Sequence, residues 1–325
     1  MPGSGEGKTF MQSKSPPVAI VGNINLDVKT GPLAADPRLF RDGETSVGEI
    51  YETIGGGGAN TAVAAAGLGA SVVFCGAVGR DTLGQRLQAY LTTSGITPRL
   101  AFKQAATGRS IALNWEQHQR HFVSCLPSSA LLEADDIDLD ALAAAGCAHF
   151  YRADIWFAPL MLQEGNLRLL RGARRLGMHT SIDINWDPHW HAGRDDARVA
   201  ERIGCVKRLL PDVTYAHGNE RELRFFSGTG SLDDAVRWFF DQGAQTLIVH
   251  LGPGGSAAYA QESAPIRVPA APVARIVSEA GTGDVFTAAF LQRDNMDLCR
   301  RLTECNAIAA KHLSGETCFL SRLEG

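Results

Sequence analysis

The chain has 325 residues, of which 45% are hydrophobic and 20% charged, and 31 Lys and Arg against 35 Asp and Glu leave a net charge of -4. This balance is that of a globular protein, and it argues against long disorder and against a nucleic-acid partner, which normally requires a basic excess. Seven cysteines without a Cys-x-x-Cys pair indicate a reduced chain. Because no apolar run is long enough to span a bilayer and no secretory signal begins the chain, we expect a cytoplasmic protein without a membrane partner.

The chain divides into a short tail and one long α/β pattern. Residues 1–16 are polar and lack apolar periodicity, so we expect a disordered tail before a domain that covers 17–325. Expected strands begin at Val18, Ser71, Cys147, Thr180, Val213 and Thr246. Expected helices cover 59–68, 82–93, 159–176, 219–227, 232–242, 284–293 and 298–312. This alternation predicts a doubly wound, mainly parallel sheet with helices on both faces.

Two stretches, about 29–53 and 99–123, interrupt the alternation with short β-like runs and no helix between them. We expect them to pair as a small β-sheet lid over a site, because they flank a cluster of glycines. Exposed sheet edges tend to be covered, so a homodimer formed through the lid is a further expectation.

The first glycine cluster is residues 55–58, four consecutive glycines that are followed by Ala59, Asn60 and a helix of small residues. Glycines before a helix N-terminus let backbone N–H groups and the Asn60 side chain approach a polar ligand. A flexible hinge for the lid is the alternative interpretation, and the two are compatible.

The second cluster is Gly281, Thr282, Gly283 and Asp284, which stand directly before an apolar helix. Free N–H groups and the helix dipole at such a terminus form an anion site that suits a transferring phosphoryl group. Asp284, in the first turn, would accept a proton from a substrate hydroxyl beside that site. The alternative is that Asp284 merely caps the helix.

A third pattern, Asn219 and Glu222, offers an amide and a carboxylate for a hydrated magnesium ion, and it is also close to a helix capping box. No G-x-G-x-x-G follows any expected strand, which argues against a dinucleotide oxidoreductase.

The order of these motifs resembles the ribokinase-like, PfkB-type carbohydrate kinase family. The resemblance covers nearly the whole chain after the tail, and it rests on GNINLDV, GGGGANTAVAAAGLGASVVFCGAVGRDTLGQ, NERE, LIVHLGPGG and AGTGDVF. It implies a ribokinase-like α/β domain with a β lid that transfers the γ-phosphoryl group of ATP to a sugar hydroxyl, with Mg²⁺ as the second cofactor.

The resemblance also implies roles for residues. Asp284 matches the catalytic base, with an anion hole made by the backbone of Gly281, Thr282 and Gly283. The sugar-binding positions are Asp27, Gly57, Gly58 and Asn60. The nucleotide-binding positions are Asn185, His250, Gly252, Gly255 and Asn306, and the magnesium positions are Asn219 and Glu222. Asp27 follows the first expected strand, where a turn-stabilising role is the alternative.

Two departures from the family pattern are informative. Ser278, Glu279 and Ala280 stand where Asp-Thr-Thr is usual, which leaves a monovalent-cation site in doubt, and His250 replaces a common Thr or Ser. A nucleoside or vitamin-precursor kinase of the same fold and a non-catalytic sugar-binding regulator remain alternatives. Arg109 and Arg152 are candidates for meeting an acid or phosphate on the substrate, or are ordinary surface or ion-pair arginines.

Overall fold

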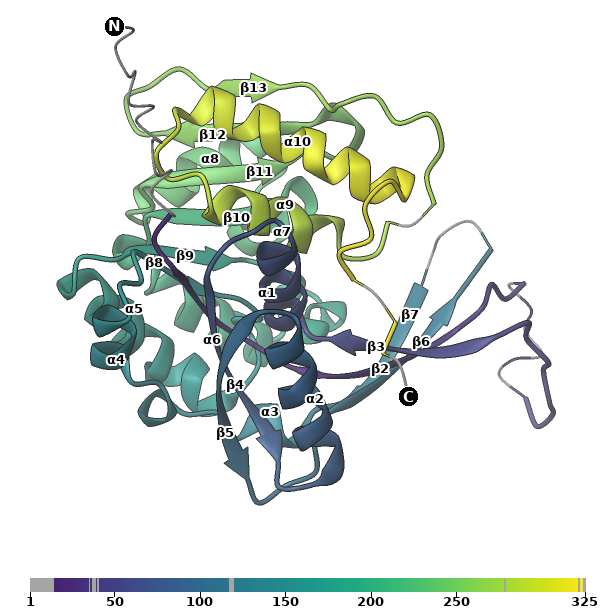
Figure 1. Cartoon of the computed structure of the whole chain (residues 1–325). Helices are drawn as coiled ribbons and strands as arrows, with labels where there is room; N and C mark the ends of the chain where they lie inside the picture. The colour runs from purple at the N-terminus through teal and green to yellow at the C-terminus, as the bar shows by residue number, and fades with distance from the viewer. Residues whose placement is uncertain are drawn as a thin grey trace, which may run out of the picture.

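The protein is built on two β-sheets, as the computed structural model of the chain shows (Figure 1). The structure describes residues 15–34, 36, 39, 41–116, 120–277, 279–320 and 322–323. Most of the expected tail, 1–14, therefore lies outside the described residues, as do 35, 37, 38, 40 and 117–119 of the expected lid and Ser278.

The larger sheet has nine strands in the order β13-β12-β11-β10-β9-β8-β1-β4-β5. Their bounds are β1 (Val18–Val21), β4 (Val72–Gly79), β5 (Ile96–Lys103), β8 (His149–Arg152), β9 (His179–Asp183), β10 (Tyr215–Asn219), β11 (Thr246–His250), β12 (Ser256–Ala260) and β13 (Ile266–Val268). Neighbouring strands from β5 to β11 pair in parallel, and β12 and β13 add antiparallel. The mainly parallel sheet expected from the sequence is confirmed.

Helices cover both faces of this sheet. They are α1 (Gly57–Gly67), α2 (Thr82–Thr93), α3 (Pro127–Ala130), α4 (Leu139–Ala144), α5 (Asn166–Arg175), α6 (Ala197–Lys207), α7 (Glu220–Ser227), α8 (Leu232–Asp241), α9 (Thr282–Leu291) and α10 (Leu298–Ser314). Among the helices in the described part of the chain, none is long and apolar enough to cross a membrane.

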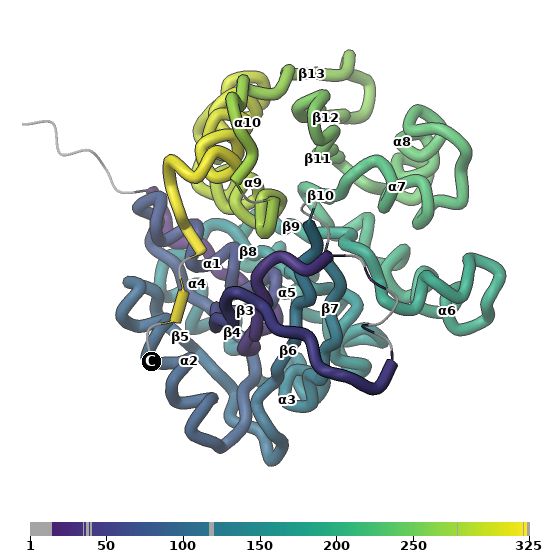
Figure 2. Tube along the Cα trace, turned by 90° about the vertical axis from the view of Figure 1, so that its right-hand side faces the viewer, coloured from purple at the N-terminus to yellow at the C-terminus, as the bar shows by residue number. Residues whose placement is uncertain are grey.

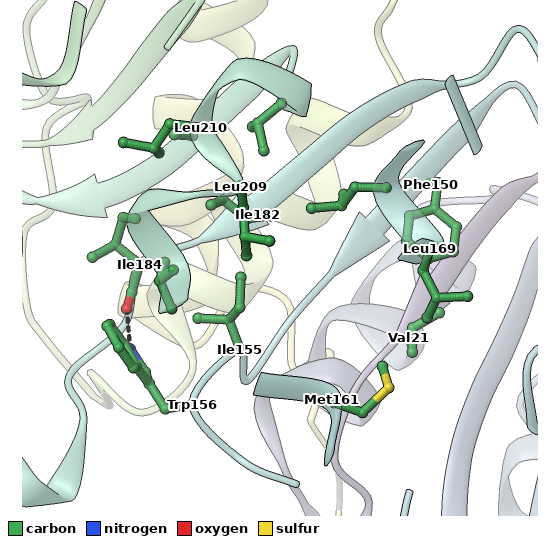
Figure 3. Close-up of a cluster of buried hydrophobic side chains, with 14 of the residues drawn as sticks. Val21, Phe150, Ile155, Trp156, Met161, Leu169, Ile182, Ile184, Leu209 and Leu210 are labelled. Carbon is green, nitrogen blue, oxygen red and sulfur yellow. Dashed lines mark hydrogen bonds between the residues drawn. The ribbon is translucent and has the colours of Figure 1, made fainter. Parts of the chain in front are cut away.

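Strand β1 shows why the strands of a sheet that is covered on both faces have continuously apolar sequences. Ala19 and Val21 pack into a cluster with α5 to α8, part of which Figure 3 shows. Val18 and Ile20 point to the other face and pack with α1, α2 and α9. Strands buried on both sides lack the polar alternation of a surface strand, so these runs were recognisable in the sequence.

The lid is the smaller sheet, whose strands β3 (Ile50–Gly55), β2 (Asn25–Thr30), β6 (Arg109–Asn114) and β7 (Arg120–Cys125) pair in that order. A separate small sheet is confirmed, but its limits differ from those expected. The lid begins at Asn25, and the segment from Arg99 to Lys103 belongs to β5, which pairs with β4 in the larger sheet. Leu100 and Phe102 pack against the core beside α2, so burial places this segment at the edge of the larger sheet.

Candidate active site

The candidate site lies where the N-termini of α1 and α9 meet the carboxyl end of β8. The two helices lie side by side, although more than 200 residues separate them in the chain (Figure 1). In Figure 2, α9 lies above the strands of the lid. Ligands of open α/β sheets bind at this edge, outside the carboxyl ends of the strands.

One hydrogen bond joins the two glycine-rich blocks. Asn60 Nδ2 donates to Asp284 Oδ2 over 3.1 Å. The residue that caps α9 is Gly281, whose φ of 73° is left-handed and which has no side chain to cap with. Asp284 is therefore not the helix cap, and its carboxylate is held by α1 instead. The structure brings Asp284 and Asn60 together, and it places the predicted anion hole in the first turn of α9.

A residue that sequence reasoning missed, Asp154, organises the other side of the site. Its carboxylate accepts hydrogen bonds from the backbone N–H groups of Asn23 (2.8 Å), Gly58 (2.8 Å) and Gly57 (3.2 Å). The N–H groups that the sequence assigned to a ligand are thus used by Asp154. Its only sequence signal is a carboxylate two residues past a buried strand, β8.

The glycines also permit a close backbone approach. A Cβ atom on Gly58 would lie 2.6 Å from Gly22 Cα, and one on Gly57 would lie 2.8 Å from Asp154 Oδ1. Both distances are shorter than any side chain tolerates. The start of α1 is therefore packed closely against the loop after β1. This packing argues against the interpretation of the four glycines as a flexible hinge.

Burial is the largest cause, and the neighbouring negative charge of Asp154 the second, of a pKa of Asp284 that is raised to about 7. The hydrogen bond from Asn60 and the positive charges of Arg120 and Lys29 act in the opposite direction. A base is most effective when its pKa lies near the working pH, and strongly perturbed carboxyls cluster at functional sites. This electrostatic environment suits proton acceptance.

Asp27 lies inside β2 of the lid and not in a turn after β1, which corrects the turn alternative. It is 6% exposed, accepts a hydrogen bond from Asn25 Nδ2 at 2.7 Å, and its Oδ2 lies 3.9 Å from Lys29 Nζ. Burial raises its pKa, and Lys29 is the strongest opposing influence.

The expected nucleotide positions are of two kinds. Asn185, two residues after β9, and His250, the last residue of β11, each bury a polar atom that has no hydrogen-bond partner among the described residues, Asn185 Oδ1 and His250 Nε2. Such atoms are costly unless a ligand satisfies them, so both fit a nucleotide. Gly252 and Gly255 form the turn after β11, with φ of 55° and 89°. Asn306 instead donates to the carbonyls of Val268 and Pro269, and its amide serves the fold.

Asn219 and Glu222 form the capping box that the sequence allowed. Asn219 Oδ1 accepts from the N–H of Glu222 at 2.9 Å, and Glu222 Oε2 accepts from the N–H of Asn219 at 2.8 Å. Burial raises the pKa of Glu222, and burial together with the charge of Glu222 raises that of Asp183 well above its usual range. Two buried carboxyls of this kind fit a divalent cation, which would offset their repulsion.

The other sequence candidates have structural partners. Arg152 is 1% exposed and donates to Asn166 Oδ1 at 2.8 Å, so it serves the core. Near the doubtful monovalent-cation site, the Glu279 carbonyl accepts from Thr282 Oγ1 at 3.0 Å, and the Ala280 carbonyl lies 2.7 Å from His312 Nε2.

The chain is similar in sequence and in fold to known carbohydrate kinases. The model of a family described as pfkB family carbohydrate kinase matches residues 18–310. A ribokinase of Arabidopsis thaliana is 26% identical over 298 residues, which are 87% of this chain and 72% of that protein. A 5-dehydro-2-deoxygluconokinase of Clostridium perfringens is 25% identical over 282 residues, with coverage of 82% and 79%. A protein from E. coli assigned as ribokinase II and solved with ATP and Mg²⁺ shares the fold, with a TM-score of 0.76, 20% identity and coverage of 92% and 93%.

The raised pKa of Asp284 predicts a stability cost that depends on pH. The unfolded chain ionises this carboxyl near pH 4 and the folded chain only near pH 7, so stability falls as pH rises between these values. Asp284→Asn should therefore increase the free energy of unfolding by about 2 to 4 kcal/mol at pH 8 and by less at pH 5.

Urea unfolding at both pH values measures the difference. The matched control is Asp297→Asn, because Asp297 caps α10 by accepting from the N–H of Arg300 at 3.0 Å and asparagine caps a helix about as well, so stability should change little at either pH. An Asp284→Asn variant that is no more stable than the wild type at pH 8 would contradict the raised pKa.

Proposed function

The chain belongs to the pfkB family of carbohydrate kinases, and on that premise we propose that it transfers the γ-phosphoryl group of ATP to a hydroxyl of a sugar or sugar derivative. The observation that carries the proposal is the Asp284 carboxylate, which is bonded to Asn60 and stands in the first turn of α9. A proton acceptor and an anion site are thus side by side. Phosphoryl transfer requires little more than positioning, charge stabilisation and such a base.

In this mechanism the hydroxyl of the acceptor lies within hydrogen-bond reach of Asp284, which takes up its proton as the bond to phosphorus forms. Asn60 holds the carboxylate in place. The N–H group of Gly283, in the first turn of α9, would donate to the developing negative charge, and that of Thr282, which here donates to the Glu279 carbonyl over 3.4 Å, lies beside it. Asp27 accepts hydroxyl hydrogen bonds from the lid side. Asn185 and His250 would satisfy their buried polar atoms on the nucleotide.

Two alternatives remain distinguishable. A nucleoside or vitamin-precursor kinase would use the same base and anion hole, and a panel of acceptors separates these substrates. A non-catalytic sugar-binding regulator would have no need of a carboxyl whose pKa is raised to about 7. The 5-dehydro-2-deoxygluconokinase among the relatives supports a sugar derivative as acceptor. The seven cysteines, which form no disulfide, support a reducing compartment such as the cytoplasm.

The base assignment predicts that Asp284→Asn loses turnover without losing the fold. Asparagine keeps the shape and the contact with Asn60 but cannot accept a proton, so kcat should fall by about 100-fold or more. Steady-state ATP consumption with the best acceptor measures the loss. Asp297→Asn, which changes an aspartate at the start of α10, should stay within about twofold of the wild type. Near-normal turnover in a folded Asp284→Asn variant would remove Asp284 from the chemistry.

We also propose that Glu222 and Asp183 organise the magnesium that accompanies ATP. The ion would neutralise phosphate charge, and Glu222 would hold its water shell. Glu222→Gln should raise the Mg²⁺ concentration for half-maximal activity by about tenfold, because glutamine keeps the capping box but loses the charge.

The control for the magnesium titration is Glu220→Gln. Glu220 lies in the same first turn of α7, but its side chain is 46% exposed and pairs with Arg224. Its titration should match that of the wild type. An unchanged midpoint in Glu222→Gln would assign Glu222 to helix capping alone.

The face of the lid opposite to Asp27, here called the outer face, supports the proposed homodimer. Ile50, Ile111 and Val123 are 65%, 50% and 58% exposed, and the register places Ile111 directly opposite Val123. Exposed apolar sheet residues of this kind are typical of an interface. Sedimentation equilibrium should show a dimer that Val123→Glu converts to a monomer. Leu160→Glu, at a similarly exposed leucine remote from the lid, should remain dimeric, and a monomeric wild type would contradict the proposal.

A further inference from the structure

The face of the lid that carries Asp27 is here called the inner face. Successive residues of a strand point to opposite faces of a sheet, so the register identifies which side chains share it. Asp27 pairs with Ser110, Lys29 with Ala112, Ala112 with Phe122, and Asn114 with Arg120. The bond from Ser110 Oγ to Ser124 Oγ, 2.9 Å, agrees with this assignment. The inner face therefore contains Asp27, Lys29, Ser110, Ala112, Phe122, Ser124 and Arg120.

This face is turned toward the candidate base. Ser110 and Ala112 on it are buried, while Ile111 between them is half exposed on the outer face. The positive charges of Lys29 and Arg120 both act on Asp284 and on Asp27 and lower the pKa of each. Two cations of the lid thus lie within electrostatic reach of the place where the acceptor hydroxyl reacts.

The two cations differ in whether they have an ion-pair partner in the protein. Lys29 has a partner, since its Nζ lies 3.9 Å from Asp27 Oδ2. Arg120 is exposed, and its side chain forms no hydrogen bond or ion pair with any residue that the structure describes. Neighbouring strands lie about 4.8 Å apart, so the long side chains of β2 and β7 can converge over Ala112 and Phe122. A small anion bound there would contact both cations.

We propose that the acceptor is an anionic sugar derivative whose carboxylate or phosphate group is bound by Arg120 together with Lys29. This inference rests on the proposed function, because it concerns the same site. In the proposed function the transferred phosphoryl group lies at the start of α9. Lys29 lies instead on β2, the strand that also carries Asp27, which contacts the acceptor hydroxyls. The guanidinium of Arg120 offers paired N–H groups that match a carboxylate or phosphate. The inner face would therefore bind both a hydroxyl group and the anionic group of the same acceptor.

Arg109 provides a matched control. It lies on the same lid and is exposed, but it pairs with Leu26 and Cys125 and therefore points to the outer face. The sequence named Arg109 as a candidate for meeting a substrate anion, and the register assigns that role to Arg120 instead. Arg109→Gln and Arg120→Gln remove the same charge from the two faces of one sheet.

The test compares kcat/KM for matched acceptors: a set of aldoses, the corresponding aldonic acids and the corresponding sugar phosphates. The wild type should favour one anionic class over its neutral counterpart by about tenfold or more, and the class identifies the anion. Arg120→Gln should abolish that preference, so that kcat/KM falls by about tenfold more for the anionic acceptor than for the neutral sugar. Arg109→Gln should keep it. Equal losses for neutral and anionic acceptors, or a raised KM for ATP, would overturn the proposal by assigning Arg120 to the transferred phosphoryl group.

A calorimetric titration without ATP separates this inference from the proposed function. If no acceptor is turned over, the proposed function fails, but tighter binding of an aldonic acid or sugar phosphate that Arg120→Gln weakens would still support the anion site. If the wild type turns over neutral sugars and binds the anions no more tightly, the anion site is wrong and the kinase proposal stands.

Discussion

The carboxylate of Asp154 is the contact that fixes the geometry of the site. It accepts backbone N–H groups from the loop after β1 and from the first residues of α1, and so ties three segments that are distant in the chain. Charged acceptors of backbone N–H groups are among the stronger hydrogen bonds in proteins. With α1 held in this way, Asn60 reaches Asp284, and the base is oriented by a residue of the other glycine-rich block.

The same arrangement makes the site electrostatically costly. Burial raises the pKa of both Asp154 and Asp284, and the charge of Asp154 raises that of Asp284 as well. A protein selected for stability alone would not place two carboxyls together in this way, and active sites commonly retain such costs because function requires them. The basic residues of the lid, Lys29 and Arg120, offset part of the negative charge. In the proposed reaction they would do so while they hold the acceptor.

The fold and part of the site could be predicted because their signals are local. Alternating apolar runs gave the parallel sheet, and two glycine-rich blocks before helices located Asn60 and Asp284. The segment from Arg99 to Lys103 was assigned to the lid but belongs to β5, which also contains Pro98; proline is tolerated there because β5 is an edge strand. Asp154 was missed because its partners lie 96 to 131 residues away in the chain. The role of Arg120 depends on sheet register, which a sequence pattern does not specify.

The account makes Asp154 both the anchor of α1 and the cause of part of the raised pKa of Asp284, and a pH profile tests the second role directly. The acidic limb of kcat/KM reports the ionisation of the base in the free enzyme. In the wild type this limb should lie near pH 7, where the pKa of Asp284 falls. Asp154→Asn removes the neighbouring charge and should move the limb to lower pH in a folded protein. A limb that does not move, or one that lies near pH 4 in the wild type, would contradict the account.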